Sequence, residues 1–92
     1  MLMNVAGPIL RQAANDRGFV DLAVFGSVAR GEAGVNSDID LLVNPPANTT
    51  ITDLIAMKQV FEAILGRAVD LVTYRGLRPG IDDDIREEAV LL

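Results

Sequence analysis

The chain contains no cysteine and no histidine, and these two absences exclude whole classes of site. Without cysteine there are neither disulfide bonds nor thiolate metal ligands. Without either residue type an ordinary zinc site is excluded as well, because such sites are built from sulfur and nitrogen ligands. A metal site in this chain would therefore have to be made of oxygen ligands.

Basic residues and long apolar runs are also scarce. Eight Lys and Arg stand against thirteen Asp and Glu, which gives a formal charge of −5. Such a balance does not suit a protein that grips a nucleic-acid backbone. No apolar run approaches the ~18 residues of a membrane span, and the start lacks the basic segment of a secretion signal. We therefore expect a cytoplasmic protein that binds neither nucleic acid nor membrane directly.

Apolar residues, in contrast, make up 50% of the 92 residues. This length suits one domain, residues 1–92, and leaves no room for a second. The core of so small a domain is modest, so we expect some apolar surface to pack on a protein partner. One candidate contact surface is C-terminal, although a helix packed on its own sheet is the commoner arrangement. It comprises Ile81, Ile85, Ala89, Val90, Leu91 and Leu92.

Hydrophobic periodicity and capping signals predict the order helix, strand, short helix, strand, helix, strand, helix. The first helix should begin with Pro8 at its first position and end before Gly18. The expected helices are 8–17, 27–30, 50 or 52 to 65, and 81–92, and the expected strands are 19–25, 38–43 and 68–74. This order predicts a small α/β (α+β) domain whose mixed sheet of three to four strands is flanked by about four helices, mainly on one face.

Two finer expectations follow from the same pattern. Gly31, Gly34, Asn36 and Ser37 mark a loop between the first two strands. The third helix should turn one apolar face toward the core, formed by Leu54, Ile55, Met57, Phe61, Ile64 and Leu65.

Three aspartates interrupt otherwise apolar strands. Asp38 and Asp40 are two residues apart, so on a strand both carboxylates share one face and Ile39 points to the other. Asp70 is the single acid in the third strand. Aspartate is a poor strand former, and adjacent half-buried carboxylates repel each other unless a cation neutralises them. If the strands are neighbours, Asp38, Asp40 and Asp70 converge on one Mg²⁺ or Mn²⁺ site, since these ions prefer oxygen ligands. A single such Asp could equally be a turn or surface residue.

Upstream of these acids, Gly26-Ser27 follows the first strand directly. A glycine that ends a strand and opens a helical turn allows the backbone to approach a phosphate closely. The N–H groups of the turn and the Ser27 hydroxyl can then donate hydrogen bonds to it. Arg30 lies one turn further on and could add a charge-assisted contact, although a solvent-exposed role fits it as well.

Together these residues resemble a known signature. Gly26-Ser27, ten intervening residues and Asp38-Ile39-Asp40 resemble the motif of the DNA polymerase β-like nucleotidyltransferase superfamily. The segments Phe-Gly-Ser-Val-Ala-Arg-Gly-Glu-Ala (25–33) and Asn-Ser-Asp-Ile-Asp-Leu-Leu-Val (36–43) resemble its minimal branch, the MNT or MntA-like antitoxins. The resemblance covers nearly the whole chain, because this branch is little more than the catalytic core.

The resemblance implies a role for each matching residue. Gly26 and Ser27 would hold the triphosphate of ATP, and Arg30 would assist them. Asp38 and Asp40 would bind the Mg²⁺ or Mn²⁺ ions that bridge the phosphates. Asp70 would complete the metal site and help to deprotonate or orient the attacking hydroxyl. Two such ions stabilise the entering and leaving oxygens of an in-line displacement.

In the minimal branch the resemblance also implies a partner, a HEPN-domain ribonuclease toxin. The antitoxin would transfer AMP from ATP to a tyrosine of this toxin and so silence it. The acidity and the apolar surplus of the chain suit such a partner. Two alternatives remain open: an antitoxin that neutralises by complex formation alone, and a nucleotidyltransferase subunit that modifies an antibiotic or another small hydroxyl compound.

Overall fold

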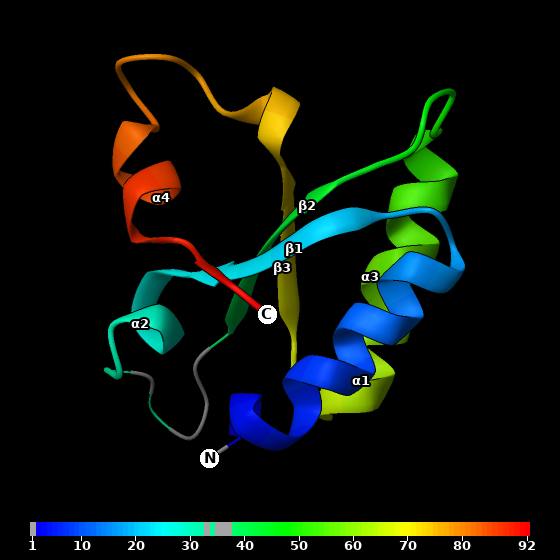
Figure 1. The fold of residues 1–92 in the computed structure, drawn as a ribbon, viewed down its shortest axis with the longest axis horizontal. Helices are drawn as coiled ribbons and strands as arrows, with labels where there is room; N and C mark the ends of the chain where they lie inside the picture. Colours follow the sequence, from blue (N-terminus) through cyan, green and yellow to red (C-terminus); the bar gives the residue numbers. More distant parts are fainter. Residues whose placement is uncertain (1, 33, 35–37) are drawn as a thin grey trace.

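The computed structural model describes residues 2–32, 34 and 38–92, which form a four-stranded mixed sheet with helices packed on it (Figure 1). The elements follow in the order α1 (Leu2–Asp16), β1 (Val20–Phe25), α2 (Gly26–Ala29), β2 (Ile39–Asn44), α3 (Ile51–Leu65), β3 (Val69–Thr73), the 3₁₀ turn η1 (Tyr74–Gly76), α4 (Asp83–Glu88) and β4 (Val90–Leu91). The predicted mixed sheet with about four helices is confirmed. Asn36 and Ser37 of the predicted loop lie outside the described residues.

The strand order across the sheet is β3-β2-β1-β4. β1 runs antiparallel to both β2 and β4, whereas β2 and β3 are parallel. A parallel pair needs a crossover connection, and α3 supplies it between β2 and β3. In the order β3-β2-β1-β4 the two central strands are β1 and β2, and in the view of Figure 1 the labelled strands cross near the middle of the molecule.

The larger part of the core lies between the sheet and the helix pair α1 and α3 (Figure 1). Ile39 and Leu41 of β2 project into it and are fully buried, together with Leu10 of α1 and Phe61 of α3. Ile55 is an exception to the predicted apolar face of α3, because half of it remains exposed. The opposite face of the sheet carries a smaller apolar cluster under η1 and α4, formed by Ala23, Phe25, Leu42 and Leu77.

Local signals fix the ends of α3. The Thr50 side chain accepts a hydrogen bond from the Asp53 N–H, and the Asp53 carboxylate accepts one from the Thr50 N–H. This reciprocal capping box satisfies two N–H groups that the helix itself leaves unpaired. Gly66 ends the helix in the left-handed conformation with φ +66°. Of the two predicted start positions, Thr50 is therefore the cap.

The first helix begins earlier than predicted, at Leu2, so Pro8 lies inside it and not at its first position. A proline inside a helix removes one backbone hydrogen bond. Ala6, Leu10 and Ala14, spaced four residues apart, are all buried against the core. The burial of Ala6 upstream of Pro8 explains why the helix extends beyond the proline.

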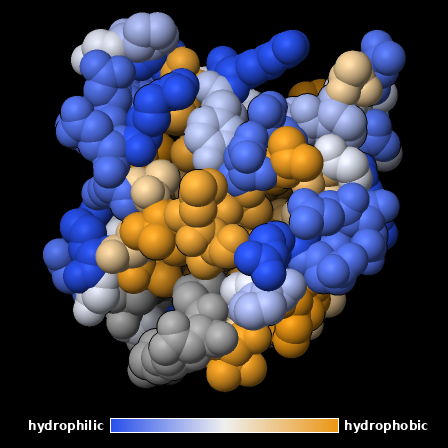
Figure 2. Space-filling view, viewed as in Figure 1, coloured by the Kyte–Doolittle hydropathy of each residue, from blue (hydrophilic) through white to orange (hydrophobic). Residues whose placement is uncertain are grey.

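The C-terminal segment differs most from the prediction. α4 ends at Glu88, and Val90–Leu91 form the strand β4 against Ala23 and Val24 of β1. The predicted helix over 81–92 is therefore wrong at both ends, because the open edge of β1 offers hydrogen-bonding partners that no local pattern reveals. Val90 and Leu91 remain 52% and 69% exposed. Figure 2 shows the molecule in the same view as Figure 1. An apolar area lies in the centre of this view, where the C-terminal strand β4 lies in Figure 1.

Within residues 2–32, 34 and 38–92, no helix is both long and apolar enough to cross a membrane.

Candidate nucleotide and metal site

The register of the sheet brings the predicted site residues of three strands together. Asp40 of β2 is paired with Asp70 of β3 on one side and with Phe25 of β1 on the other. Gly26 follows Phe25 directly, so the glycine turn and both acids lie at the same end of neighbouring strands. The condition set for convergence of the carboxylates, that the strands of Asp40 and Asp70 are neighbours, is thus met.

Strand alternation places Asp40 on the face that does not carry the main core. Ile39 and Leu41 enter the core under α1 and α3, whereas Leu42 belongs to the opposite cluster under α4. Asp40 has the same parity as Leu42 and therefore faces the side of the sheet that α4 covers.

Asp40 is half-buried and surrounded by acids. Burial is the largest influence that raises the pKa of this carboxyl, followed by the negative charges of Asp70, Asp38 and Glu88, while Arg30 opposes the shift. Burial and like charges both disfavour the ionised form of a carboxyl group. The fold thus places Asp40 where a cation would relieve an unfavourable charge.

Gly26 is required at its position for two reasons. Its φ of +70° lies in the left-handed region, which glycine adopts without the steric penalty of a side chain. A Cβ atom built on Gly26 would also overlap with Oδ2 of Asp40. The Asp40 carboxylate therefore lies directly against the backbone of the glycine turn.

Ser27 lies in the short helix α2, and Arg30 is the residue that directly follows it. The sequence predicted this helix one residue later, over 27–30. Ser27 is partly buried. Arg30 ends the helix, and its guanidinium donates to the carboxylates of Glu88 and Glu32. These hydrogen bonds raise the pKa of Arg30, and its guanidinium, which is positively charged in proteins in any case, lies beside the acids of the sheet.

Asp38 and Asp70 are exposed, whereas the sequence suggested that they would be half-buried like Asp40. Asp38 precedes β2 and directly follows residues 35–37, which lie outside the described residues. Among the residues that are described, no three acidic side chains stand close enough together to hold one metal ion. Joint metal binding by Asp38, Asp40 and Asp70 therefore stays a prediction, and the all-oxygen donor set and the unfavourable charge of Asp40 fit Mg²⁺ or Mn²⁺.

The structure adds Glu88 of α4, which the sequence did not single out. Its Oε1 accepts from the Gly26 N–H at 2.9 Å, and Nη1 of Arg30 donates to its Oε1 and Oε2 at 3.2 and 3.0 Å. In the sequence Glu88 is one of several acids in a helix, a pattern that is usually a solvated face. Only the packing of α4 beside α2 reveals its contacts.

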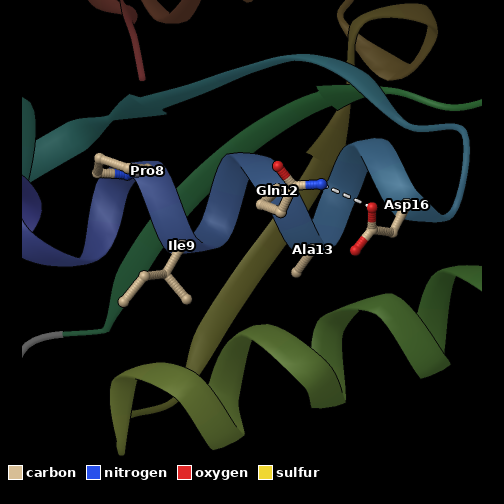
Figure 3. Close-up of a pocket in the computed structure, with 5 residues that line it drawn as sticks. All are labelled: Pro8, Ile9, Gln12, Ala13 and Asp16. Atoms are coloured by element: carbon tan, nitrogen blue, oxygen red, sulfur yellow. Dashed lines mark hydrogen bonds between the residues drawn. The ribbon is translucent and has the colours of Figure 1, made fainter.

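An open hollow on the molecule lies elsewhere, along α1 (Figure 3). Pro8, Ile9, Gln12, Ala13 and Asp16 line it, and Gln12 donates a hydrogen bond to Asp16 at 2.7 Å. Ile9 and Ala13 point toward α3 in Figure 3. None of the predicted site residues lines this hollow, so it is separate from the candidate site.

Comparison with known proteins agrees with this geometry. The family model described as a nucleotidyltransferase domain matches residues 9–92. The chain belongs to the nucleotidyltransferase domain family. It is therefore a nucleotidyltransferase. This confirms the predicted fold and the family that the resemblance of the segment from Gly26 to Asp40 indicated.

Relatives of this nucleotidyltransferase include the protein adenylyltransferase MntA of Thermococcus cleftensis, which is 38% identical over 79% of this chain and 74% of the relative. A Methanocaldococcus jannaschii protein, provisionally named a protein adenylyltransferase, is 41% identical over 74% of this chain and 73% of its own. These names support an MntA-like nucleotidyltransferase.

Two solved structures share the fold. One is described as a minimal nucleotidyltransferase and superposes with a TM-score of 0.86 at 38% identity, covering 99% of this chain and 95% of the other. The second is a toxin–antitoxin complex with AMP-PNP, with a TM-score of 0.78 at 21% identity over 95% of this chain and 71% of that one. At this identity the second structure supports the fold alone.

Proposed function

We propose that this nucleotidyltransferase is the antitoxin of a toxin–antitoxin pair and transfers AMP from ATP to a tyrosine of a HEPN-domain ribonuclease toxin. The observation that carries the proposal is the position of Asp40, which lies between the Gly26 turn and Asp70. This arrangement suits a phosphate chain held beside carboxylates that share a cation. The name of the Thermococcus relative favours a protein as the acceptor.

Each site residue has a role in this reaction. Gly26, Ser27 and Arg30 bind the triphosphate, and Asp38, Asp40 and Asp70 hold Mg²⁺ or Mn²⁺. When bound, the ions neutralise charge on the phosphates and on the leaving pyrophosphate. Asp70 orients the attacking phenol and accepts its proton. A bond forms between the phenolic oxygen and the α-phosphorus, the bond to the β-phosphate oxygen breaks, and pyrophosphate leaves.

The surface around β4 supports a protein partner. Val90 and Leu91 are exposed on an edge strand, and the net charge of −5 complements the basic surface expected of an RNA-cleaving toxin. The site and this surface act together in the proposal, because the acceptor tyrosine arrives on the partner. We place the reaction in the cytoplasm.

The test uses the purified protein, Mg²⁺ and the protein encoded beside it. ATP labelled at the α-phosphate distinguishes AMP transfer from phosphorylation, which would carry only the γ-label. We expect α-label on a partner tyrosine, and no label with Asp38→Asn or Asp40→Asn. Glu87→Gln, an exposed charge change on α4, is the matched control and should label the partner like wild type.

Other results would replace the proposal. Neutralisation of the toxin that survives both Asp substitutions would mean that complex formation alone protects the cell. Label that appears only on an added small hydroxyl compound would indicate a small-molecule transferase. If wild type and Asp40→Asn label the partner equally, the carboxylates do not have the role in AMP transfer that we assign to them.

A further inference from the structure

The contacts of Glu88 coincide with the groups proposed to bind phosphate. Its carboxylate receives the Gly26 N–H at 2.9 Å and both of its oxygens lie within hydrogen-bonding distance of Arg30 Nη1. The Glu88 side chain is 29% exposed and that of Arg30 is 47% exposed. Both partners are therefore accessible from solvent, and a ligand could reach them.

A carboxylate and a phosphate compete for such donors. Each is an anion that accepts hydrogen bonds from backbone N–H groups and from guanidinium. The Gly26 N–H is a single donor, and it cannot serve Glu88 and a phosphate oxygen with full strength at once. The negative charge of Glu88 would also repel a polyphosphate placed beside Gly26, because the two anions would lie only a few ångströms apart.

We propose that Glu88 is an internal competitor of the nucleotide: its carboxylate occupies the phosphate-binding groups Gly26 N–H and Arg30, and ATP must displace it to bind. This inference rests on the proposed function and deepens it, since it names the residue that sets nucleotide affinity at that site. Displacement frees the Gly26 N–H and the Arg30 guanidinium for the phosphate. If Glu88 only positioned Arg30 for ATP, the effect of removing it would have the opposite sign.

Nucleotide affinity of Glu88 variants tests the proposal. ATP is titrated by calorimetry into wild type, Glu88→Gln and Glu88→Ala, with and without Mg²⁺, and Glu87→Gln serves as the neighbouring charge control. We expect the Kd for ATP to fall roughly three- to tenfold in both Glu88 variants, given the usual strength of a half-exposed charge-assisted contact. Glu87→Gln should bind ATP like wild type.

Tripolyphosphate locates the effect at the phosphates, because it lacks the base and the sugar. Its Kd should fall by a similar factor in the Glu88 variants. Unchanged or weaker ATP binding in both variants overturns the proposal. So does a gain with ATP that tripolyphosphate does not reproduce.

A measurement on the wild-type protein keeps the test independent of how the variants fold. Tripolyphosphate should shift the NMR signals of both the Gly26 amide and the Glu88 side-chain carboxyl carbon. A shift at Gly26 with an unmoved Glu88 carboxyl overturns displacement. If the wild type binds ATP and labels its partner but the Glu88 variants bind ATP no more tightly, the competitor role of Glu88 is refuted and the proposed function stands. Wild type that binds no ATP refutes the proposed function with it.

Discussion

At the scale of single residues, Asp40 carries an unfavourable charge that the proposed cation site would explain. The carboxyl is half-buried and faces Asp70, Asp38 and Glu88, and its raised pKa reports the penalty on the ionised form. In the proposed site, a bound cation would relieve the repulsion that Asp40 meets when the site is empty. Stability and function therefore make opposite demands on this residue.

Asp40→Asn should stabilise the metal-free protein by on the order of 1 kcal/mol at neutral pH while it abolishes nucleotidyl transfer. The folded-state pKa of Asp40 lies above its unfolded value, so wild-type stability from this group is present at low pH and is lost as pH rises through the folded pKa. The gain from Asp40→Asn should therefore disappear below about pH 3.9. Urea unfolding in EDTA across pH measures it, and a variant less stable than wild type at pH 7 would contradict it.

Gly26→Ala should destabilise the fold more than an equivalent substitution at Gly66. Both glycines have nearly equal positive φ, +70° and +66°, but a Cβ at Gly66 meets no atom within 4 Å, whereas at Gly26 it overlaps with the Asp40 carboxylate. Gly66→Ala should cost about 1–2 kcal/mol for its backbone conformation alone. Gly26→Ala should cost about 1 kcal/mol more.

A double mutant separates the two causes at Gly26. If the excess arises from overlap with the carboxylate, then adding Asp40→Ala should remove it and leave only the backbone penalty. Urea unfolding of the single and double variants gives this coupling directly. Equal losses for Gly26→Ala and Gly66→Ala would mean that the Asp40 contact has no energetic weight.

At the scale of elements, α3 depends on its cap. Thr50→Ala removes one half of the capping box and should lower the free energy of unfolding by ~1 kcal/mol, or about 4–8 °C in Tm. Thr52 lies inside the helix, is exposed and is the matched control, because Thr52→Ala should be neutral or slightly stabilising there. Thermal unfolding by circular dichroism separates the two, and a larger loss at Thr52 would reject Thr50 as the cap.

Elements with strong local signals were predictable from the sequence, and those decided by tertiary pairing were not. The three longer strands are mainly apolar and α3 has clear capping signals. The structure has every end of these four elements within one residue of the prediction. β4 could not be foreseen, because Val90–Leu91 are too few to show a period and owe their conformation to the edge of β1.

The same distinction holds within the site. Asp40 and Asp70 could be singled out as candidates because an acid in an apolar strand violates a local rule, and the pairing of their strands brings them side by side. The contact between Gly26 and Asp40 and the contacts of Glu88 depend on how strands and helices pack. Gly26 and Glu88 are 62 positions apart in the sequence, and nothing in the intervening segment signals that the two meet.

At the scale of the whole molecule, ligand binding should be visible as stability, because a ligand that binds only the folded chain stabilises all of it. ATP with Mg²⁺ at a hundredfold excess over its Kd should add ~2.7 kcal/mol to the free energy of unfolding. For a domain of this size such a gain corresponds to a rise in Tm of roughly 10–20 °C. EDTA should remove most of the rise, since the phosphates would then face the acids of the sheet without a cation between them.

Asp38→Asn and Asp40→Asn should lose most of this ATP-dependent rise, although the second variant starts from a higher Tm without ligand. Glu87→Gln should keep the full rise, because its charge lies outside the contacts of the site. Differential scanning fluorimetry of the four proteins with ATP, ATP plus Mg²⁺ and ATP plus EDTA measures the effect. A Mg²⁺-dependent rise in Tm of equal size in wild type and in both Asp variants would contradict the prediction. The protein would then bind the nucleotide and its metal without these carboxylates, at a place other than beside Asp40.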